Sequence, residues 1–322
     1  MSGRYSGLLT NNIYYSQGSN IASKLNICSA LLPNFEKYVI SPNAEINYHL
    51  AGYGYSFSDG LTRLGGESVE RAAGVLAQKY LANRIFESNY MKVRENAVDK
   101  KYLMPYTVNQ LKAINKLRSD FRSSAFDVNE KLLWIRTQSL YSTQKEVVVP
   151  ANDFLFGMPG ENMHMLSVST GTAAHVTWRE ALTNSIIEYI QIDSFTSTWY
   201  SVKKVDGIHL NELYNKELKD KIVNLMGNVF TKYDVLILNY SKFAAVPIYV
   251  FGVFIISKSG HNIPAISFGL QGGLEVNDTI YRAFCEAFAN REMSESNYIS
   301  FSKFEDVDLK KMVDFDKNVA FF

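Results

Sequence analysis

Hydrophobic residues recur at intervals of three and four positions in several segments, the spacing of amphipathic helices. In one of them Leu111, Ile114 and Leu117 line up on one helical face. The other segments each carry one polar stripe beside an apolar one. The sequence therefore predicts helices over the ranges from about Thr62 to Asn83, Val108 to Arg122, Trp178 to Phe195 and Asp278 to Arg291.

Shorter runs rich in β-branched, aliphatic and aromatic residues lie between these helices and predict strands. They cover Leu132–Arg136, Val147–Val149, Val235–Asn239 and Ile248–Ser257. Ala265–Phe268 leads into the glycine-rich stretch Gly269–Gly273, which we expect to be a turn. No regular βαβ alternation is present, so the pattern predicts an α+β fold with a mixed or antiparallel sheet.

The longest apolar run, Phe243 to Ile256, contains Pro247 and Gly252. It is shorter than the roughly 20 residues that a membrane-spanning helix needs. We expect a buried strand pair, or one long strand with a bulge at Gly252.

The polar stripes of three predicted helices are candidate binding surfaces. On the first helix, Val69, Ala72, Ala73 and Leu76 form an apolar stripe that predicts a core face. Its polar stripe contains Glu67, Glu70, Arg71 and Gly74. The polar stripe of the second helix contains Asn184, Glu188 and Gln191, and that of the third contains Arg282, Glu286 and Asn290. A solvated helix face is the ordinary interpretation of each.

The glycines beside the first stripe favour a second interpretation. Gly65, Gly66 and Gly74 would let a ligand or another backbone approach the carboxylates closely. Carboxylate and amide oxygens are the ligands that Mg2+ prefers, and arginines grip phosphates in a forked geometry. The stripes could therefore hold magnesium and a phosphate-bearing ligand.

Composition and charge narrow the choice of partner. The chain has 322 residues, 47% of them hydrophobic, and a formal net charge of +1. That balance gives no electrostatic reason to expect a nucleic acid or a membrane as partner. Cys28 and Cys285 form no CxxC pair, so no zinc site or disulfide framework is expected and a cytoplasmic location is the default.

Three stretches together resemble the YcaO family. The first joins Ala51–Gly54 to Leu64–Arg71, with its Glu-x-x-Glu-Arg sequence. The second joins the small-residue turn Ser169–Ala174 to Glu180–Asp193, and the third is the Arg-Ala-Phe-Cys-Glu-Ala helix that begins at Arg282 and ends at Arg291. Their order and spacing fit the family from position 51 to 291.

The resemblance implies one YcaO-like domain over residues 1–322, with helices around a site for ATP and Mg2+. It implies that Glu67, Glu70, Glu188 and Glu286 are metal ligands, directly or through water. The implied nucleotide-binding set contains these four residues together with Arg71, Gln191 and Arg291.

Several positions depart from the family pattern. Tyr53 stands where many members have lysine, and Arg63 stands where serine is common. Gln191 and Ile192 replace a Glu-Arg pair, and Ala289 replaces a frequent glutamine. No proline follows Pro264, so we expect the chain to lack the family's usual proline-rich tail.

The implied activity is ATP-dependent cyclodehydration of Cys, Ser or Thr in a ribosomally made precursor peptide, giving thiazoline or oxazoline rings. The resemblance also implies a partner protein of the E1-like (ThiF-like) kind that binds the leader segment of the precursor peptide. The alternatives are the formation of a thioamide or an amidine, and a non-catalytic scaffold that binds a nucleotide.

No catalytic residue is predicted. Among the isolated histidines, His49, His164, His175, His209 and His261, His175 is the one to test.

Overall fold

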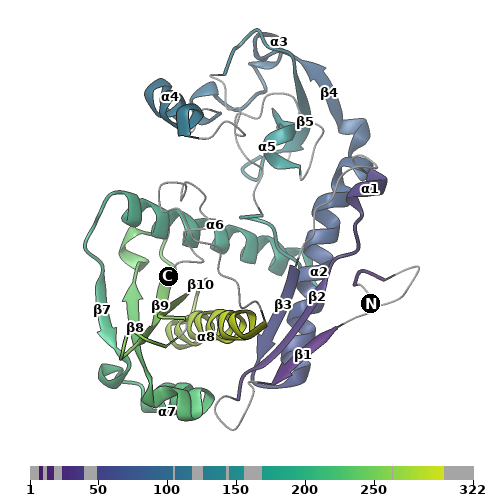
Figure 1. Ribbon diagram of the computed structural model, residues 1–322. Helices are drawn as coiled ribbons and strands as arrows, with labels where there is room; N and C mark the ends of the chain where they lie inside the picture. The colour runs from purple at the N-terminus through teal and green to yellow at the C-terminus, as the bar shows by residue number, and fades with distance from the viewer. Residues whose placement is uncertain are drawn as a thin grey trace. The chain divides into compact units, whose positions relative to one another are not determined.

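The computed structural model describes residues 7–9, 13–17, 24–39, 49–103, 106–117, 126–142, 145–155, 169–262 and 264–300 (Figure 1). The chain divides into two compact units, which are described separately. The first contains Met1–Leu31, His49–Glu70 and Thr170–Phe322, and the second contains Leu32–Tyr48 and Arg71–Ser169. Helix α2 (Phe57–Tyr80) runs from the first unit into the second. The expectation of a single domain stays a prediction.

The first unit holds two antiparallel sheets. A three-stranded sheet has the order β1-β2-β3, and a four-stranded sheet has the order β10-β9-β8-β7. The strands are β1 (Tyr14–Gln17), β2 (Asn26–Leu31), β3 (His49–Gly54), β7 (Asp206–His209), β8 (Tyr233–Asn239), β9 (Tyr249–Ser257) and β10 (Ile266–Gly273). Besides the first part of α2, the helices are α6 (Trp178–Tyr200), α7 (Lys216–Met226), α8 (Val276–Ser300) and the short 3-10 turns Leu210–Glu212, Gly227–Thr231 and Ser241–Phe243.

The main core of this unit lies between the four-stranded sheet and helices α7 and α8. Alternate residues of β8 and β9, such as Ile237 and Val253, point inward, as expected for strands with one face buried. Phe284 and Phe288 of α8 stack on each other in the same cluster, with ring centroids 5.5 Å apart. Figure 1 shows α8 running beside β10 and β9.

Strand β9 is regular where we expected a bulge. Gly252 pairs with Leu238 on one side and with Leu270 on the other, without an extra residue. A Cβ atom at Gly252 would lie 2.8 Å from the Tyr240 ring and 2.9 Å from the Phe268 ring. The glycine therefore makes room for two aromatic rings, and the bulge prediction was wrong.

The glycine-rich stretch Gly269–Gly273 is likewise part of a strand, because β10 continues to Gly273 opposite Tyr249. The predicted turn was wrong at this point. Glycine content lowers intrinsic strand propensity, but close packing of helix and strand outweighs it here.

The second unit has its own antiparallel sheet, of order β4-β5-β6. Trp134 of β5 is fully buried, and its indole nitrogen donates to the Ser88 carbonyl oxygen at 2.9 Å. The unit contains the second part of α2 and the elements α1 (Glu36–Val39), Ala82–Arg84 as a 3-10 turn, β4 (Ile85–Ser88), α3 (Tyr90–Val93), Lys100–Tyr102 as a 3-10 turn, α4 (Val108–Leu117), β5 (Leu132–Gln138), β6 (Glu146–Pro150) and α5 (Ala151–Phe154).

The α+β fold class is confirmed, since the paired strands of all three sheets are antiparallel and helices accompany them. The apolar stripe predicted for α2 was wrong in part: Val69 and Ala73 are exposed, and the buried residues include Leu64, Ala72 and Val75. No helix in the described ranges has the length and apolar character to cross a membrane. The end of the chain, where the absent tail was predicted, lies outside the described residues.

Candidate functional site

The polar stripe of α8 lies along the outer edge of β10. Asn290 donates to the Phe268 carbonyl at 2.9 Å, Glu286 accepts from the Leu270 N–H at 3.0 Å, and Arg282 donates to the Gly272 carbonyl at 2.7 Å. Four residues of helix advance about 6 Å, and two residues of strand advance about 6.7 Å. Helix and strand therefore stay in register, and every second residue of β10, namely Phe268, Leu270 and Gly272, contacts one side chain of the α8 stripe.

Gly269 explains how α8 comes this near. A Cβ atom at this position would lie 2.3 Å from the Ala283 carbonyl oxygen and 2.4 Å from the Ala287 nitrogen. Only a residue without a side chain allows the two backbones to approach to this distance.

Gln191 binds the same strand edge from helix α6. Its amide nitrogen donates to the Leu270 carbonyl at 2.8 Å, and its amide oxygen accepts from the Gly272 N–H at 2.6 Å. The side chain is buried. Gln191 thus pairs with the edge of β10 through one donor and one acceptor, as a neighbouring strand would. Its assignment as a nucleotide ligand stays a prediction.

Two carboxylates of the site meet on one short loop before α6. Glu70 of α2 accepts from the Thr172 hydroxyl at 2.7 Å, and Glu188 of α6 accepts from the Gly171 N–H at 3.1 Å. Gly171 has a positive φ of 86°, which explains why glycine occupies this turn. Ser185 donates to the Gly171 carbonyl and fixes the loop from the other side.

Glu67 occupies the free edge of the other sheet. Its carboxylate accepts from the Ala51 N–H at 2.8 Å, on the side of β3 that no strand of the described ranges covers. Gly52 lets α2 lie close to β3, since a Cβ atom there would be 2.0 Å from the Gly60 carbonyl oxygen. The close approach of helix and strand brings Glu67 within reach of the edge.

Electrostatics connect Glu286 with the remaining carboxylates. Burial raises the pKa of Glu286 from 4.5 to about 7; the Gln271 amide and the Leu270 N–H oppose the shift, and the nearby charge of Glu188 adds to it. Burial also raises the pKa of Tyr53 well above its usual value, and the negative charges of Glu286 and Glu67 add to that shift. Glu67 and Glu286 therefore both act on Tyr53, and Glu188 acts on Glu286.

The donor set fits a magnesium ion that is shared with phosphates. Within the described ranges, no group of three or more His, Cys, Asp or Glu side chains forms a ready metal cage. Mg2+ commonly uses only one or two carboxylates and completes its shell with water and phosphate oxygens. A cation beside Glu188 and Glu286 would offset the repulsion that raises the pKa of Glu286.

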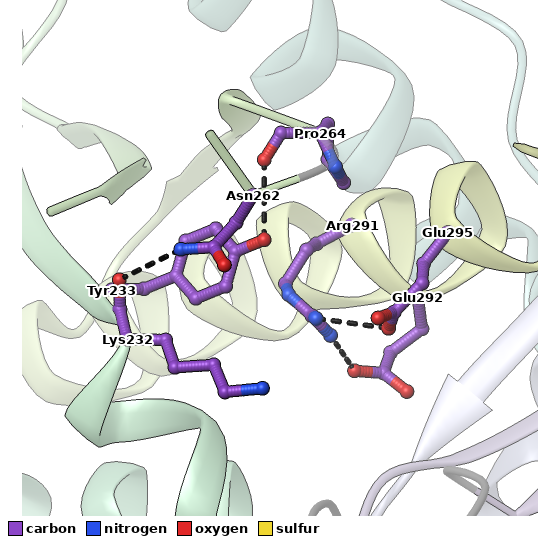
Figure 2. A network of polar contacts seen from close by, with 7 residues as sticks. All are labelled: Lys232, Tyr233, Asn262, Pro264, Arg291, Glu292 and Glu295. Carbon is purple, nitrogen blue, oxygen red and sulfur yellow. Dashed lines mark hydrogen bonds and ion pairs between the residues drawn. The ribbon is translucent and has the colours of Figure 1, made fainter. Parts of the chain in front are cut away.

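Arg291, one of the two predicted arginines, pairs with acidic side chains of its own helix. Figure 2 shows Arg291 together with Glu292 and Glu295, beside the ring of Tyr233. Arg291 is buried and donates to Glu292 and, at 2.9 Å, to the Glu295 carboxylate. Its guanidinium carbon lies 4.7 Å from the centroid of the Tyr233 ring. Arg291 therefore faces this network and is left out of the site that we propose. Arg71 is the first residue of α2 that belongs to the second unit, and its role stays a prediction.

Some contacts could not be foreseen from spacing. Gln271 donates to Glu286 at 2.8 Å, yet it lay in the stretch predicted as a turn. The small-residue pattern at Ser169–Ala174 was the available signal for the loop that holds Glu70 and Glu188. His175 pairs with Glu180 at 2.8 Å near the start of α6, and His164 lies outside the described residues.

A family model decides the relationship. The model described as YcaO cyclodehydratase, ATP- and Mg2+-binding, matches residues 51–321. This chain belongs to the YcaO family. The match confirms the resemblance, and because the family model describes an ATP- and Mg2+-binding domain, it confirms ATP and Mg2+ as the cofactors.

Solved structures agree on the YcaO fold. A YcaO protein from Methanopyrus kandleri, bound with AMPPCP and Mg2+, has a TM-score of 0.60 at 16% identity, over 89% of this chain and 63% of its own. A heterocyclase in complex with substrate and cofactor has a TM-score of 0.71 at 15% identity, over 98% of this chain and 41% of its own.

The microcin synthetase McbBCD complex of E. coli gives a TM-score of 0.58 at 13% identity, over 98% of this chain and 72% of its own. The present chain thus spans less than two thirds of the first two structures. No curated protein matches it significantly.

Proposed function

We propose that this chain uses ATP to activate backbone amides of a ribosomally made precursor peptide. The expected products are thiazoline or oxazoline rings formed at Cys, Ser or Thr residues. Membership of a family described as cyclodehydratases supports this proposal. So do the solved structures of similar fold, one a heterocyclase with substrate and another a microcin synthetase with its pro-peptide.

One observation carries the proposal: carboxylates from separate helices gather in one place. Glu70 and Glu188 hold the same loop, and Glu188 acts on the buried Glu286. We assign Glu67, Glu70, Glu188 and Glu286 to Mg2+ and the phosphates, with Arg71 following on α2.

The protein's part in this chemistry is positioning and charge compensation. When bound, ATP supplies the phosphoryl group that turns an amide oxygen into a phosphate leaving group, and Mg2+ offsets the charge of the phosphates. The side chain of the peptide provides the nucleophile, so no covalent nucleophile is required of the enzyme. The loop at Gly171–Thr172 orients Glu70 and Glu188 through its hydroxyl and N–H groups.

A precursor peptide and a separate leader-binding protein of the E1-like kind complete the proposed system, which we place in the cytoplasm. The chain would be incubated with ATP, a candidate precursor peptide and the partner, while peptide mass and released phosphate are followed. Loss of one water per ring supports the cyclodehydratase. Exchange of oxygen for sulfur would indicate a thioamide, replacement of the oxygen by nitrogen an amidine, and an unchanged peptide with bound ATP a scaffold.

A binding experiment tests the residue assignment. Glu188→Ala should abolish Mg2+-ATP binding, because it removes a charge beside Glu286 and releases the Gly171 loop. Asp193→Ala, an exposed acid on the same helix, is the matched control and should bind as the unmodified protein does. Unchanged affinity of the Glu188 variant would remove this residue from the site.

A further inference from the structure

Arg63 is a cation on α2, one helical turn after Asp59. It precedes Glu67 by one helical turn and Glu70 by two, so the three side chains share one stripe. The side chain is exposed. Among the residues that the structure describes, Arg63 forms no ion pair or side-chain hydrogen bond, and its guanidinium carbon lies 5.4 Å from the centroid of the Tyr53 ring.

The surroundings of Arg63 are negatively charged but do not neutralise it. Glu67 binds the Ala51 N–H, and Glu286 binds the Leu270 N–H and the Gln271 amide. Both carboxylates act on the Tyr53 hydroxyl, over whose ring Arg63 lies. Asp59, one helical turn before Arg63, also interacts with its charge, but the Asp59 carboxylate accepts from Ser56 and forms no ion pair with Arg63. Within the described ranges, no side chain of this helix face therefore accepts from the guanidinium group.

We propose that Arg63, held over the Tyr53 ring, contacts the triphosphate of bound ATP and is a phosphate-binding residue of this chain. A guanidinium group presents several donors in a plane and binds phosphate oxygens in pairs. The inference rests on the proposed function, since it requires ATP beside Glu67 and Glu70. It adds a residue to the nucleotide-binding set that the resemblance implied.

The proposal also accounts for two departures from what the resemblance leads us to expect. Tyr53 stands where the resemblance implies lysine, and Arg63 stands where it implies serine. The two side chains touch across β3 and α2, so a positive charge lost at one position is restored at its neighbour. Tyr53 then serves as a flat support, since an aromatic face attracts a guanidinium group.

The test measures binding by isothermal titration calorimetry with the full chain, Mg2+, and either ATP or AMP. Arg63→Gln should raise the Kd for ATP roughly 10- to 100-fold, the effect of losing a charge-assisted contact. The Kd for AMP should not change, and Arg63→Lys should fall between. Equal ATP binding by Arg63→Gln, or equal losses for ATP and AMP, would overturn the assignment.

Lys221→Gln is the matched control. Lys221 also lies over a tyrosine ring, with Nζ 3.6 Å from the Tyr281 centroid, and it forms no ion pair among the described residues, but it belongs to α7. It should bind ATP normally. A loss equal to that of Arg63→Gln would show a general charge effect and contradict a specific contact.

A reciprocal exchange tests the positional argument. Arg63→Ser should weaken ATP binding, and adding Tyr53→Lys should restore it to within about threefold of the original, equivalent to about 0.65 kcal/mol. A folded double variant that binds no better than Arg63→Ser would overturn the exchange. If the unmodified chain binds no Mg2+-ATP, the proposed function fails first; if it binds and Arg63→Gln binds equally, only the inference about Arg63 fails.

Discussion

Helices α8 and α2 carry similar polar stripes and use them differently. The stripe of α8 is bound to the edge of β10 through Arg282, Glu286 and Asn290. The α2 stripe contacts a backbone group of β3 through Glu67 and the Thr172 hydroxyl through Glu70. Arg63, which precedes Glu67 on this helix, is exposed.

The difference shows that a polar helix face can cap a sheet edge or present oxygens to a ligand. Unpaired edge groups that are buried must find partners, and α8 supplies them together with Gln191 of α6. We therefore expect changes on α8 to cost mainly stability and changes on α2 to cost mainly nucleotide binding.

The largest effect is expected where α8 touches β10. Gly269→Ala would place a Cβ atom 2.3 Å from the Ala283 carbonyl oxygen, so the helix must move away from the strand. We expect the free energy of unfolding to fall by about 3 kcal/mol, as measured by urea denaturation. A variant as stable as the parent would contradict the close packing.

Glu286→Ala compared with Glu67→Ala separates the two stripes directly. Loss of Glu286 leaves the Leu270 N–H and the Gln271 amide without their acceptor, at a cost of about 3 kcal/mol. Glu67→Ala removes one acceptor and should cost about 1 kcal/mol. Glu286→Gln is the control, since its amide oxygen can still accept; equal losses for both alanine variants in urea melts would erase the distinction.

The pH dependence of stability without Mg2+ gives an intermediate effect. Glu286 has a pKa of about 7 in the folded chain and an ordinary value of 4.5, so the folded state holds the proton more tightly. Stability from this group is therefore greatest at low pH and declines by about 2 kcal/mol between pH 5 and 7.

Subtracting the pH profile of Glu286→Gln from that of the unmodified protein isolates this contribution in thermal melts. A difference that stays flat from pH 5 to 7 would show that burial and Glu188 do not raise the pKa of Glu286 in the folded chain.

The smallest effect is expected on α2. Gly66 lies inside the helix, and a Cβ atom there would meet nothing within 4 Å. Gly66→Ala should raise the free energy of unfolding by roughly 0.5–1 kcal/mol, because alanine favours helix and restricts the unfolded chain. If the variant were less stable in the same urea assay, an added Cβ atom at Gly66 would meet a neighbouring atom, contrary to the open space seen there.

The stripe of α8 was predictable from the sequence because helical periodicity alone places Arg282, Glu286 and Asn290 on one face. On α6, helical periodicity alone would place Ile186 and Tyr189 on an apolar core face, opposite Asn184 and Glu188, but both are exposed. Ile187 packs in the cluster with Tyr240 and Leu270 instead. Periodicity sets which residues share a face, and the packed neighbours decide which face is buried.

The carboxylates of the site were predicted by resemblance, but their contacts depend on tertiary structure. The meeting of Glu70 and Glu188 requires the loop at Gly171–Thr172, which spacing does not position. The edge role of Gln191 could not be predicted while Gly269–Gly273 was expected to be a turn.

The most direct measurement of the central claim is calorimetric titration of ATP into the unmodified protein and Glu70→Ala, with Mg2+ and with EDTA. The account predicts saturable binding of one ATP per chain in Mg2+, lost in EDTA and lost in Glu70→Ala. Binding that survives both changes would contradict a site built from Glu67, Glu70, Glu188 and Glu286 around a magnesium nucleotide.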